Sequence, residues 1–187
     1  MAVEVVYETH STSVDNERGI ATGWLDGELS EWGREQASEL GRRRRDDGIA
    51  TVYASDLGRA VETARIAFGG TGIAVHHDAR LRECDYGELN GATVDAVMAV
   101  RRRHVDEPFP GGESYRQVVE RTRAFLDDVV ARHDGERVVV IAHSANRWAL
   151  DHLVSGKPLG ELVDATFDWL PGRTYLVNAS SSASDIE

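Results

Sequence analysis

An α/β fold, with a mostly parallel central sheet between two layers of helices, is the architecture that the sequence predicts. Strand-like and helix-like segments alternate over most of the chain, which is typical of parallel strands joined by helices. Residues 138–141 form the continuous apolar run Val-Val-Val-Ile, which indicates a strand that is covered on both faces. The predicted architecture is therefore a three-layer α/β/α sandwich whose central strand spans residues 137–142.

The other strands are expected where β-branched and aromatic residues are bounded by polar ones. These segments are residues 3–7, 50–54 and 73–76. The glycines at 69, 70 and 72 are interpreted as a turn, because no Gly-Lys-Ser/Thr follows as it would in a phosphate-binding loop. A hairpin about Pro171-Gly172 is expected within residues 166–178.

Helices are expected where capping residues precede an apolar periodicity. They span residues 30–45, 57–68, 93–103, 114–133 and 147–154. Ser30 and the pair Ser55-Asp56 are predicted to cap the first two. A loop with two prolines and two glycines, residues 107–114, separates the third helix from the fourth.

The chain of 187 residues, 41% of them hydrophobic, is long enough to bury one substantial core. No internal stretch resembles a linker, so residues 1–178 are expected to form a single domain. The serine-rich end, residues 179–187, is expected to be a disordered tail.

The net charge of the chain is −11, from 32 acidic and 21 basic residues. A field of this sign repels polyanions, so we expect no nucleic-acid partner. Two basic runs, Arg42–Arg45 and Arg101–His104, fall at the polar ends of predicted helices and are interpreted as solvated.

Residues 1–8 have no basic residues ahead of their apolar ones, as the start of a signal peptide would. The longest apolar run, residues 138–142, is too short to span a bilayer. We therefore expect a soluble, cytoplasmic protein with no membrane partner. The single cysteine, Cys84, fits a reducing compartment and is interpreted as a packing residue.

Histidine or arginine lies at three junctions where a predicted strand ends: His10, Arg59 one turn into its helix, and His143. The carboxyl ends of parallel strands share one edge of a sheet, where chemistry is common in open α/β folds. We therefore expect these three side chains to converge. The remaining histidines lack this placement and are interpreted as structural: His76, His77, His104, His133 and His152.

The segment around His10 resembles the histidine phosphatase, or phosphoglycerate mutase-like, superfamily. Members of that family carry Arg-His-Gly after the first strand, followed by a hydroxyl residue and an asparagine. This sequence has Thr9-His10-Ser11, then Ser13 and Asn16. The histidine, the hydroxyl and the asparagine align with the family pattern, whereas both residues flanking the histidine depart from it.

Further segments resemble the family's motifs in the family's order. They are Gly23-Trp24-Leu25-Asp26 with Leu29-Ser30, Gly33, Gln36 and Ala37; Ser55–Ala60 with Thr63-Ala64; Leu81-Arg82-Glu83 with Gly87 and Gly91; Pro110–Ser114; and Val140–His143. The resemblance spans about residues 3–155 and implies the superfamily's fold.

The resemblance implies a phosphomonoesterase that works in two steps through a phosphohistidine on His10. Glu83 is then the general acid and base, while Arg59 and His143 stabilise the phosphoryl oxygens. Such chemistry requires no metal or organic cofactor, and the implied partner is a small phosphate ester. Further residues expected to bind substrate are Thr9, Ser11, Ser13, Asn16, Arg18, Ser144 and Arg147.

Thr9 stands where the family has an arginine that grips phosphate, and Ser11 adds a side chain where the family has glycine. Loss of one charge-assisted contact costs about 1.5 to 3 kcal/mol, and loss of one transition-state donor costs about 100- to 1000-fold in rate. Arg147, four positions after His143, and Arg18, in the first loop, are the candidates for compensation. Interpretation as a surface cation is equally open for Arg147 and is favoured for Arg18.

Three functions stay open on these residues. Retention of the four catalytic motif residues favours hydrolysis of a small phosphorylated metabolite. The change at Thr9 favours the alternative, a member repurposed for acid-base chemistry on another ligand or for binding a phosphorylated ligand without turnover. Retention of Glu83 argues against a pure binding module. A mutase proper is disfavoured, because the chain is short of the additional segments of the mutases it resembles.

The sequence sets neither the substrate nor the oligomeric state, for which a homodimer is one option. Residues 85–110 are expected to form part of a lid over the site, as in similar proteins. Tyr86, Met98, Phe109 and Tyr115 are candidates for ligand contact, although core packing explains Met98 and Phe109 equally well.

Overall fold

The computed structural model describes residues 2–165 and 172–178. The first arm of the hairpin predicted about Pro171-Gly172 and the predicted tail, residues 179–187, lie outside the described residues.

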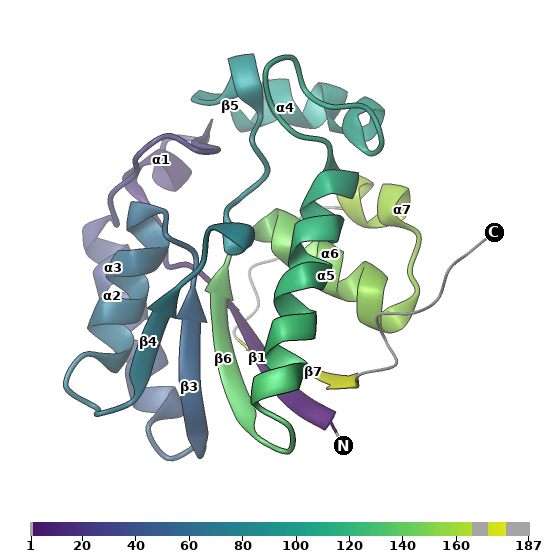
Figure 1. The fold of residues 1–187 in the computed structure, drawn as a ribbon. Coiled ribbons are helices and arrows are strands. Elements are labelled where there is room, and N and C mark those ends of the chain that lie inside the picture. The colour runs from purple at the N-terminus through teal and green to yellow at the C-terminus, as the bar shows by residue number, and fades with distance from the viewer. Residues whose placement is uncertain (1, 166–171, 179–187) are drawn as a thin grey trace.

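The central sheet has five strands in the order β4-β3-β6-β1-β7 (Figure 1). Their bounds are β1 (Ala2–Thr9), β3 (Ile49–Ala54), β4 (Ala74–His77), β6 (Arg137–Ala142) and β7 (Arg173–Asn178). β7 pairs antiparallel with β1, and the other four strands run parallel. The predicted sheet and its central strand, β6, are therefore confirmed.

Helices cover both faces of this sheet, as Figure 1 shows. α2 (Glu31–Arg44) and α3 (Gly58–Phe68) pack on one face, and α5 (Tyr115–Arg132) and α6 (Ser144–Ser155) pack on the other. The side chains of β6 alternate between the two layers. Val139 and Ile141 join the core beneath α2 and α3, whereas Val138 and Val140 join the core beneath α5 and α6. None of the helices described here is long and apolar enough to cross a membrane.

Helix starts follow the predicted caps in part. The Ser30 hydroxyl accepts a hydrogen bond from the Gly33 amide at 3.0 Å, as the cap of α2 requires. The cap predicted from Ser55-Asp56 is wrong, because α3 begins after Leu57 without a side-chain cap. The Asp56 carboxylate instead pairs with Arg82 at 2.7 Å.

The structure adds short elements that no local sequence pattern indicated: α1 (Val14–Glu17), β2 (Ile20–Ala21), β5 (Ala92–Thr93) and α7 (Leu159–Asp164). β2 pairs antiparallel with β5 and so ties the loop after β1 to the start of α4 (Val94–Val100). The helix predicted over 93–103 ends at Val100 and continues as a 3-10 turn, Arg101–His104. α4 therefore lies above the carboxyl ends of the parallel strands (Figure 1).

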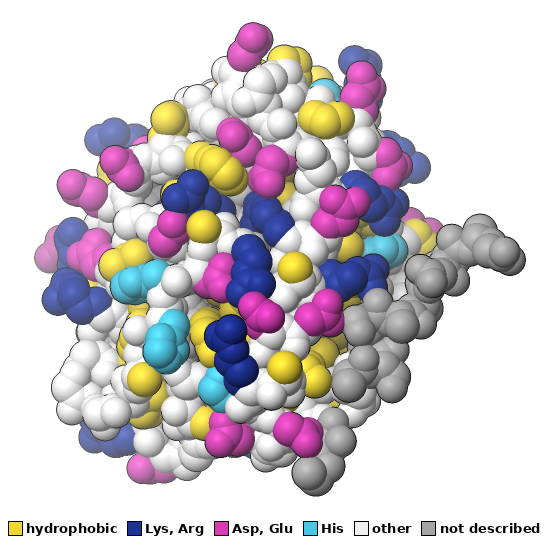
Figure 2. All heavy atoms as spheres, in the orientation of Figure 1, with side chains coloured by type: hydrophobic (Ala, Val, Ile, Leu, Met, Phe, Trp, Pro, Cys, Tyr) yellow, Lys and Arg dark blue, Asp and Glu magenta, His cyan; other side chains and the backbone are white. Residues whose placement is uncertain are grey.

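The interpretation of both basic runs as solvated helix ends is wrong for Arg44 and Arg101. Arg44 donates to Glu8 from Nη2 at 2.6 Å and from Nε at 2.9 Å, and Arg43 donates to the same carboxylate at 3.1 Å. Arg101 is 7% exposed and donates to two carbonyl oxygens at the end of α7. Elsewhere, acidic and basic side chains are interspersed on the face shown in Figure 2.

Candidate active site

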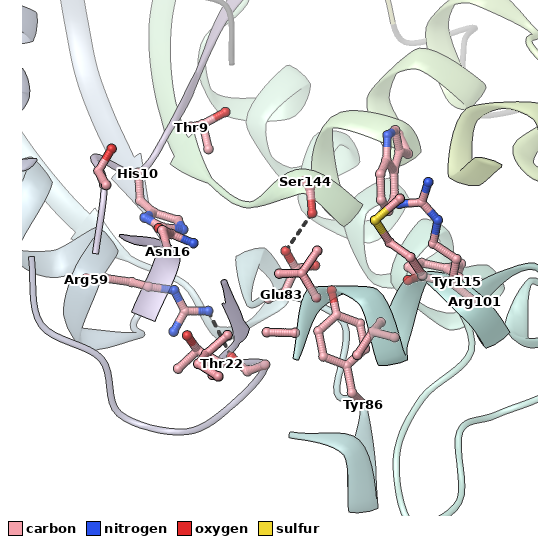
Figure 3. Close-up of a pocket in the computed structure, with 18 of the residues that line it drawn as sticks. Thr9, His10, Asn16, Thr22, Arg59, Glu83, Tyr86, Arg101, Tyr115 and Ser144 are labelled. Atoms are coloured by element: carbon pink, nitrogen blue, oxygen red, sulfur yellow. Dashed lines mark hydrogen bonds between the residues drawn. The ribbon is translucent and has the colours of Figure 1, made fainter. Parts of the chain in front are cut away.

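A cavity of about 500 Å³ opens where the parallel strands end. Its wall includes His10, directly after β1, and Arg59, in the first turn of α3. It also includes Glu83 and Ser144, the first residue of α6. Figure 3 shows these side chains around the cavity, with Glu83 and Ser144 in the middle of the view. Residues far apart in the sequence thus meet at the edge of the sheet where chemistry was expected.

His10 is a neutral, oriented imidazole. Its Nδ1 lies 2.7 Å from the Ser11 carbonyl oxygen, which can only accept, so Nδ1 carries the proton and Nε2 carries the free lone pair. Burial, and then the nearby Arg59 charge, lower the pKa of His10 from 6.5 to about 3. Near neutral pH, Nε2 is therefore available as a nucleophile.

This pKa predicts how stability depends on pH. Well above pH 6.5 the His10 imidazole is neutral in both the folded and the unfolded chain. As pH falls from 6.5 toward 3, the unfolded chain binds a proton that the folded chain excludes, so the free energy of unfolding decreases. At pH 5 this one group should cost about 2 kcal/mol.

Urea unfolding near pH 7.5 and near pH 5 tests this expectation. The decrease in the free energy of unfolding from pH 7.5 to pH 5 should be about 2 kcal/mol smaller in His10→Gln than in the wild type. The exposed His77 provides a matched control, since His77→Gln should lose as much as the wild type. Equal losses in the wild type and His10→Gln would show that the folded protein tolerates a charge on His10.

Arg59 brings a buried guanidinium to the cavity. Its Nη2 donates to the Gly23 carbonyl oxygen at 2.8 Å, which fixes the side chain within the wall. Burial lowers its pKa, and the Glu83 charge opposes this shift, but arginine stays charged at all ordinary pH values. One turn later, the Thr63 hydroxyl accepts from the Ser11 amide at 3.0 Å, so α3 also holds the loop of the nucleophile.

Glu83 is held at the N-terminus of α6. Its Oε2 accepts from the Ser144 hydroxyl at 2.8 Å, and its Oε1 accepts from the amides of Cys84 at 2.7 Å and Ala145 at 3.2 Å. Its own carbonyl oxygen accepts from Trp24 Nε1 at 2.7 Å. Cys84 is fully buried beside it, and burial raises the pKa of the thiol, in keeping with the packing role predicted for it.

His143 stands beside the nucleophile. The two imidazole centroids are 4.9 Å apart, and His143 is completely buried. Burial, and then the Arg59 charge, hold its pKa well below the usual range. Neither ring nitrogen has a hydrogen-bond partner among the described residues. A buried polar group of this kind is costly unless something satisfies it. His143 is absent from the described wall of the cavity, and its ring packs against His10, which lines that wall.

The residues expected to bind substrate divide into two groups. Thr9, Asn16 and Ser144 line the cavity, but Ser11 and Ser13 are absent from its described wall. The Ser13 hydroxyl instead accepts from the Asn16 amide at 3.1 Å and caps α1.

Neither candidate for replacing the family's arginine lines the described cavity. Arg18 is exposed, and Arg147 is half-buried on α6. Burial raises the pKa of Tyr7, and the Arg147 charge opposes that shift. The described wall contains two cations, Arg59 and Arg101. Arg59 is therefore the guanidinium that the described wall brings closest to the nucleophile, as its effect on the pKa of His10 indicates.

The cavity also contains residues that the sequence had not assigned to a site. They include Arg101, from a run interpreted as solvated, and Val94, Val97 and Trp148. Of the four ligand-contact candidates, Tyr86, Met98 and Tyr115 line the cavity, whereas Phe109 is 1% exposed in the core against Tyr115. No group of three or more histidine, cysteine or carboxylate side chains within residues 2–165 and 172–178 could hold a metal ion.

A mostly parallel sheet with histidines at two adjoining strand ends places this chain among α/β proteins whose chemistry lies at the carboxyl edge of the sheet. A family model narrows this class, since residues 9–170 match the histidine phosphatase superfamily (branch 1), and the chain belongs to that family. The resemblance drawn from the sequence motifs is therefore confirmed.

Relatives with assigned activities include both phosphatases and mutases. The chain is 34% identical over 156 residues to phosphoserine phosphatase 1 of Hydrogenobacter thermophilus, covering 79% of this chain and 74% of that protein. It is 34% identical over 154 residues to a 2,3-bisphosphoglycerate-dependent phosphoglycerate mutase of Parvibaculum lavamentivorans, covering 74% and 73%. A mycobacterial glucosyl-3-phosphoglycerate phosphatase, solved with VO3, superposes with a TM-score of 0.77 at 29% identity, covering 86% of this chain and 85% of that one. These relatives support phosphatase or mutase activity.

Proposed function

We propose that this protein is a phosphomonoesterase, which hydrolyses a small phosphorylated metabolite through a phosphohistidine on His10. The observation that carries the proposal is the grouping of a neutral, oriented His10 with Arg59 and Glu83 at one cavity, with the unsatisfied His143 ring packed against His10. Each of these groups has a distinct task in phosphoryl transfer.

In the first step, Nε2 of His10 attacks phosphorus. The N–P bond forms as the ester P–O bond breaks, and protonated Glu83 gives its proton to the leaving oxygen. Arg59 and His143 donate hydrogen bonds to the remaining phosphoryl oxygens, whose positions the buried donors fix in advance. The alcohol then leaves, and phosphate stays bonded to His10.

In the second step, water replaces the alcohol. Glu83, now a carboxylate, takes a proton from water as the water oxygen bonds to phosphorus. The N–P bond breaks, its electron pair returns to Nε2, and inorganic phosphate is released. His10 is then neutral again, and Glu83 is again protonated, so the cycle closes without any other reactant.

Trapping of the intermediate tests this function. Wild-type protein quenched during turnover of an ester labelled in its phosphoryl group should retain label that is stable in base and lost in acid. The His10→Ala variant should retain none, whereas His77→Ala, at an exposed position, should label like the wild type. Turnover by the wild type without label, or label on folded His10→Ala, would contradict the proposed intermediate.

A second candidate is a site that binds a phosphorylated ligand, or performs acid-base chemistry, without transferring the phosphoryl group. Thr9 favours it, because a threonine lines the cavity where the family motif has an arginine. Binding of vanadate or inorganic phosphate, together with no turnover and no label across a broad ester panel, would establish this alternative.

A further inference from the structure

The part of the cavity formed by α4 has an apolar wall. Val94, Val97, Met98 and Arg101 follow the spacing i, i+3, i+4 and i+7, so they share one side of α4 and the turn after it. All four line the cavity. Val94 is 38% exposed and Met98 is 44% exposed, so large apolar side chains stand open at its rim. Burial of these side chains by an apolar ligand would be favourable.

Aromatic side chains complete this part of the cavity. Tyr115 and Trp148 line it and pack edge to face, with ring centroids 5.6 Å apart. The Arg101 guanidinium lies 5.5 Å from the Trp148 ring centroid and donates to carbonyl oxygens of α7. Arg101 is thereby anchored as a part of the wall, with its charge partly satisfied by the protein.

The acid of the proposed reaction lies between the polar and apolar parts. In Figure 3, His10, Asn16 and Arg59 gather on one side of Glu83, and Tyr86, Tyr115 and Arg101 gather on the other. The leaving oxygen must lie within reach of Glu83, so the rest of the alcohol extends toward the aromatic side. A polyhydroxylated alcohol would lose its water against the apolar side chains of α4 and Trp148, which is costly, whereas an apolar one gains from burial.

We propose that the substrate is a phosphate monoester of a bulky apolar alcohol, whose apolar part is bound by the α4 side chains and Trp148. The inference rests on the function proposed above and narrows it to a substrate class. It sets this chain apart from the relatives named for phosphoserine and glucosyl-3-phosphoglycerate, since the alcohols in those names are strongly polar.

Ethyl, butyl and hexyl phosphate test the inference, because all are esters of primary alcohols with similar leaving groups. The value of kcat/KM should rise about two- to fourfold for each added CH2, or about 16- to 250-fold from ethyl to hexyl phosphate. Phosphoserine, also a primary ester, should be a poorer substrate than hexyl phosphate.

Variants locate the effect on α4. The double variant Val94→Thr/Met98→Gln should reduce the hexyl-to-ethyl ratio at least about fivefold. Met98→Gln alone, at a half-exposed position, should also reduce the hexyl-to-ethyl ratio. This single variant replaces the double variant in the test if circular dichroism shows that the double variant does not fold. Leu176→Gln is the matched control, because Leu176 is 63% exposed on β7 and lies outside the cavity wall.

The outcomes separate the two proposals. A series in which all the esters are hydrolysed equally, or phosphoserine is preferred, overturns the apolar substrate class and leaves the phosphatase proposal intact. If kcat/KM rises steeply with alkyl length and neither α4 variant reduces that rise, the apolar part of the substrate is not bound by α4. Failure of folded wild-type protein to hydrolyse any ester overturns the proposed function itself.

Discussion

Replacement of Glu83 by glutamine should slow the hydrolysis of alkyl phosphates by about 100- to 10,000-fold, the usual contribution of a positioned general acid and base. Glutamine preserves the shape of the side chain and an oxygen that can accept from the Cys84 and Ala145 amides. The Ser144 hydroxyl can turn to accept from the new amide nitrogen, because a hydroxyl both donates and accepts. The variant therefore loses the proton that Glu83 transfers but retains the hydrogen bonds that hold the side chain in place.

Comparison of two leaving groups checks this interpretation. Nitrophenolate leaves without a proton, so the first step with p-nitrophenyl phosphate should be affected far less than with an alkyl phosphate. The second step still lacks its base, and a burst of about one equivalent of nitrophenolate should precede slow turnover. Glu88→Gln, an exposed carboxylate in the same loop, should behave as the wild type. Equal losses for both esters without a burst would assign Glu83 a structural role.

Replacement of Glu8 by alanine should lower the free energy of unfolding by about 3 to 5 kcal/mol, the usual cost of removing one partner from a buried ion pair. Glu8 is 2% exposed and accepts from Arg43, Arg44 and the Gly172 amide. Arg44 is only 15% exposed, so without the Glu8 carboxylate its charge would be poorly hydrated and would depend on its pairing with Asp47.

Urea denaturation near pH 7 measures this loss, and Glu39 provides the matched comparison. Glu39 pairs with Arg42 at 2.6 Å on the exposed side of α2. Glu39→Ala should cost no more than about 1 kcal/mol, because exposed pairs contribute little. Similar losses for Glu8→Ala and Glu39→Ala would show that water reaches the Glu8 cluster.

The elements that the sequence predicted carry strong local signals. The run from Val138 to Ile141 is apolar throughout because both faces of β6 are covered. The two-residue strands β2 and β5 have no such signal, because pairing between segments about seventy residues apart creates them. The basic run at Arg42–Arg45 was wrongly interpreted as solvated for the same reason, because its partner Glu8 lies on a strand that is distant in the sequence.

The residues of the candidate site also divide into those that the sequence predicts and those that it does not. His10, Arg59 and His143 could be found because each follows a recognisable strand, and Glu83 came from the family resemblance. The α4 side chains carry a visible helical spacing, but the same spacing predicts ordinary core packing. Only the position of α4 above the strand ends distinguishes a cavity wall from ordinary core packing. That position depends on the tertiary pairing of β2 with β5.

The substitution at Thr9 bears on how the product departs. Free phosphate would meet one guanidinium beside His10 in the described wall, rather than the pair implied by the family motif. Fewer charge-assisted bonds mean a shorter residence for the dianion. Under the proposed function, such a pocket would release inorganic phosphate readily, and it would hold a phosphoryl group less firmly than transfer to a second hydroxyl requires.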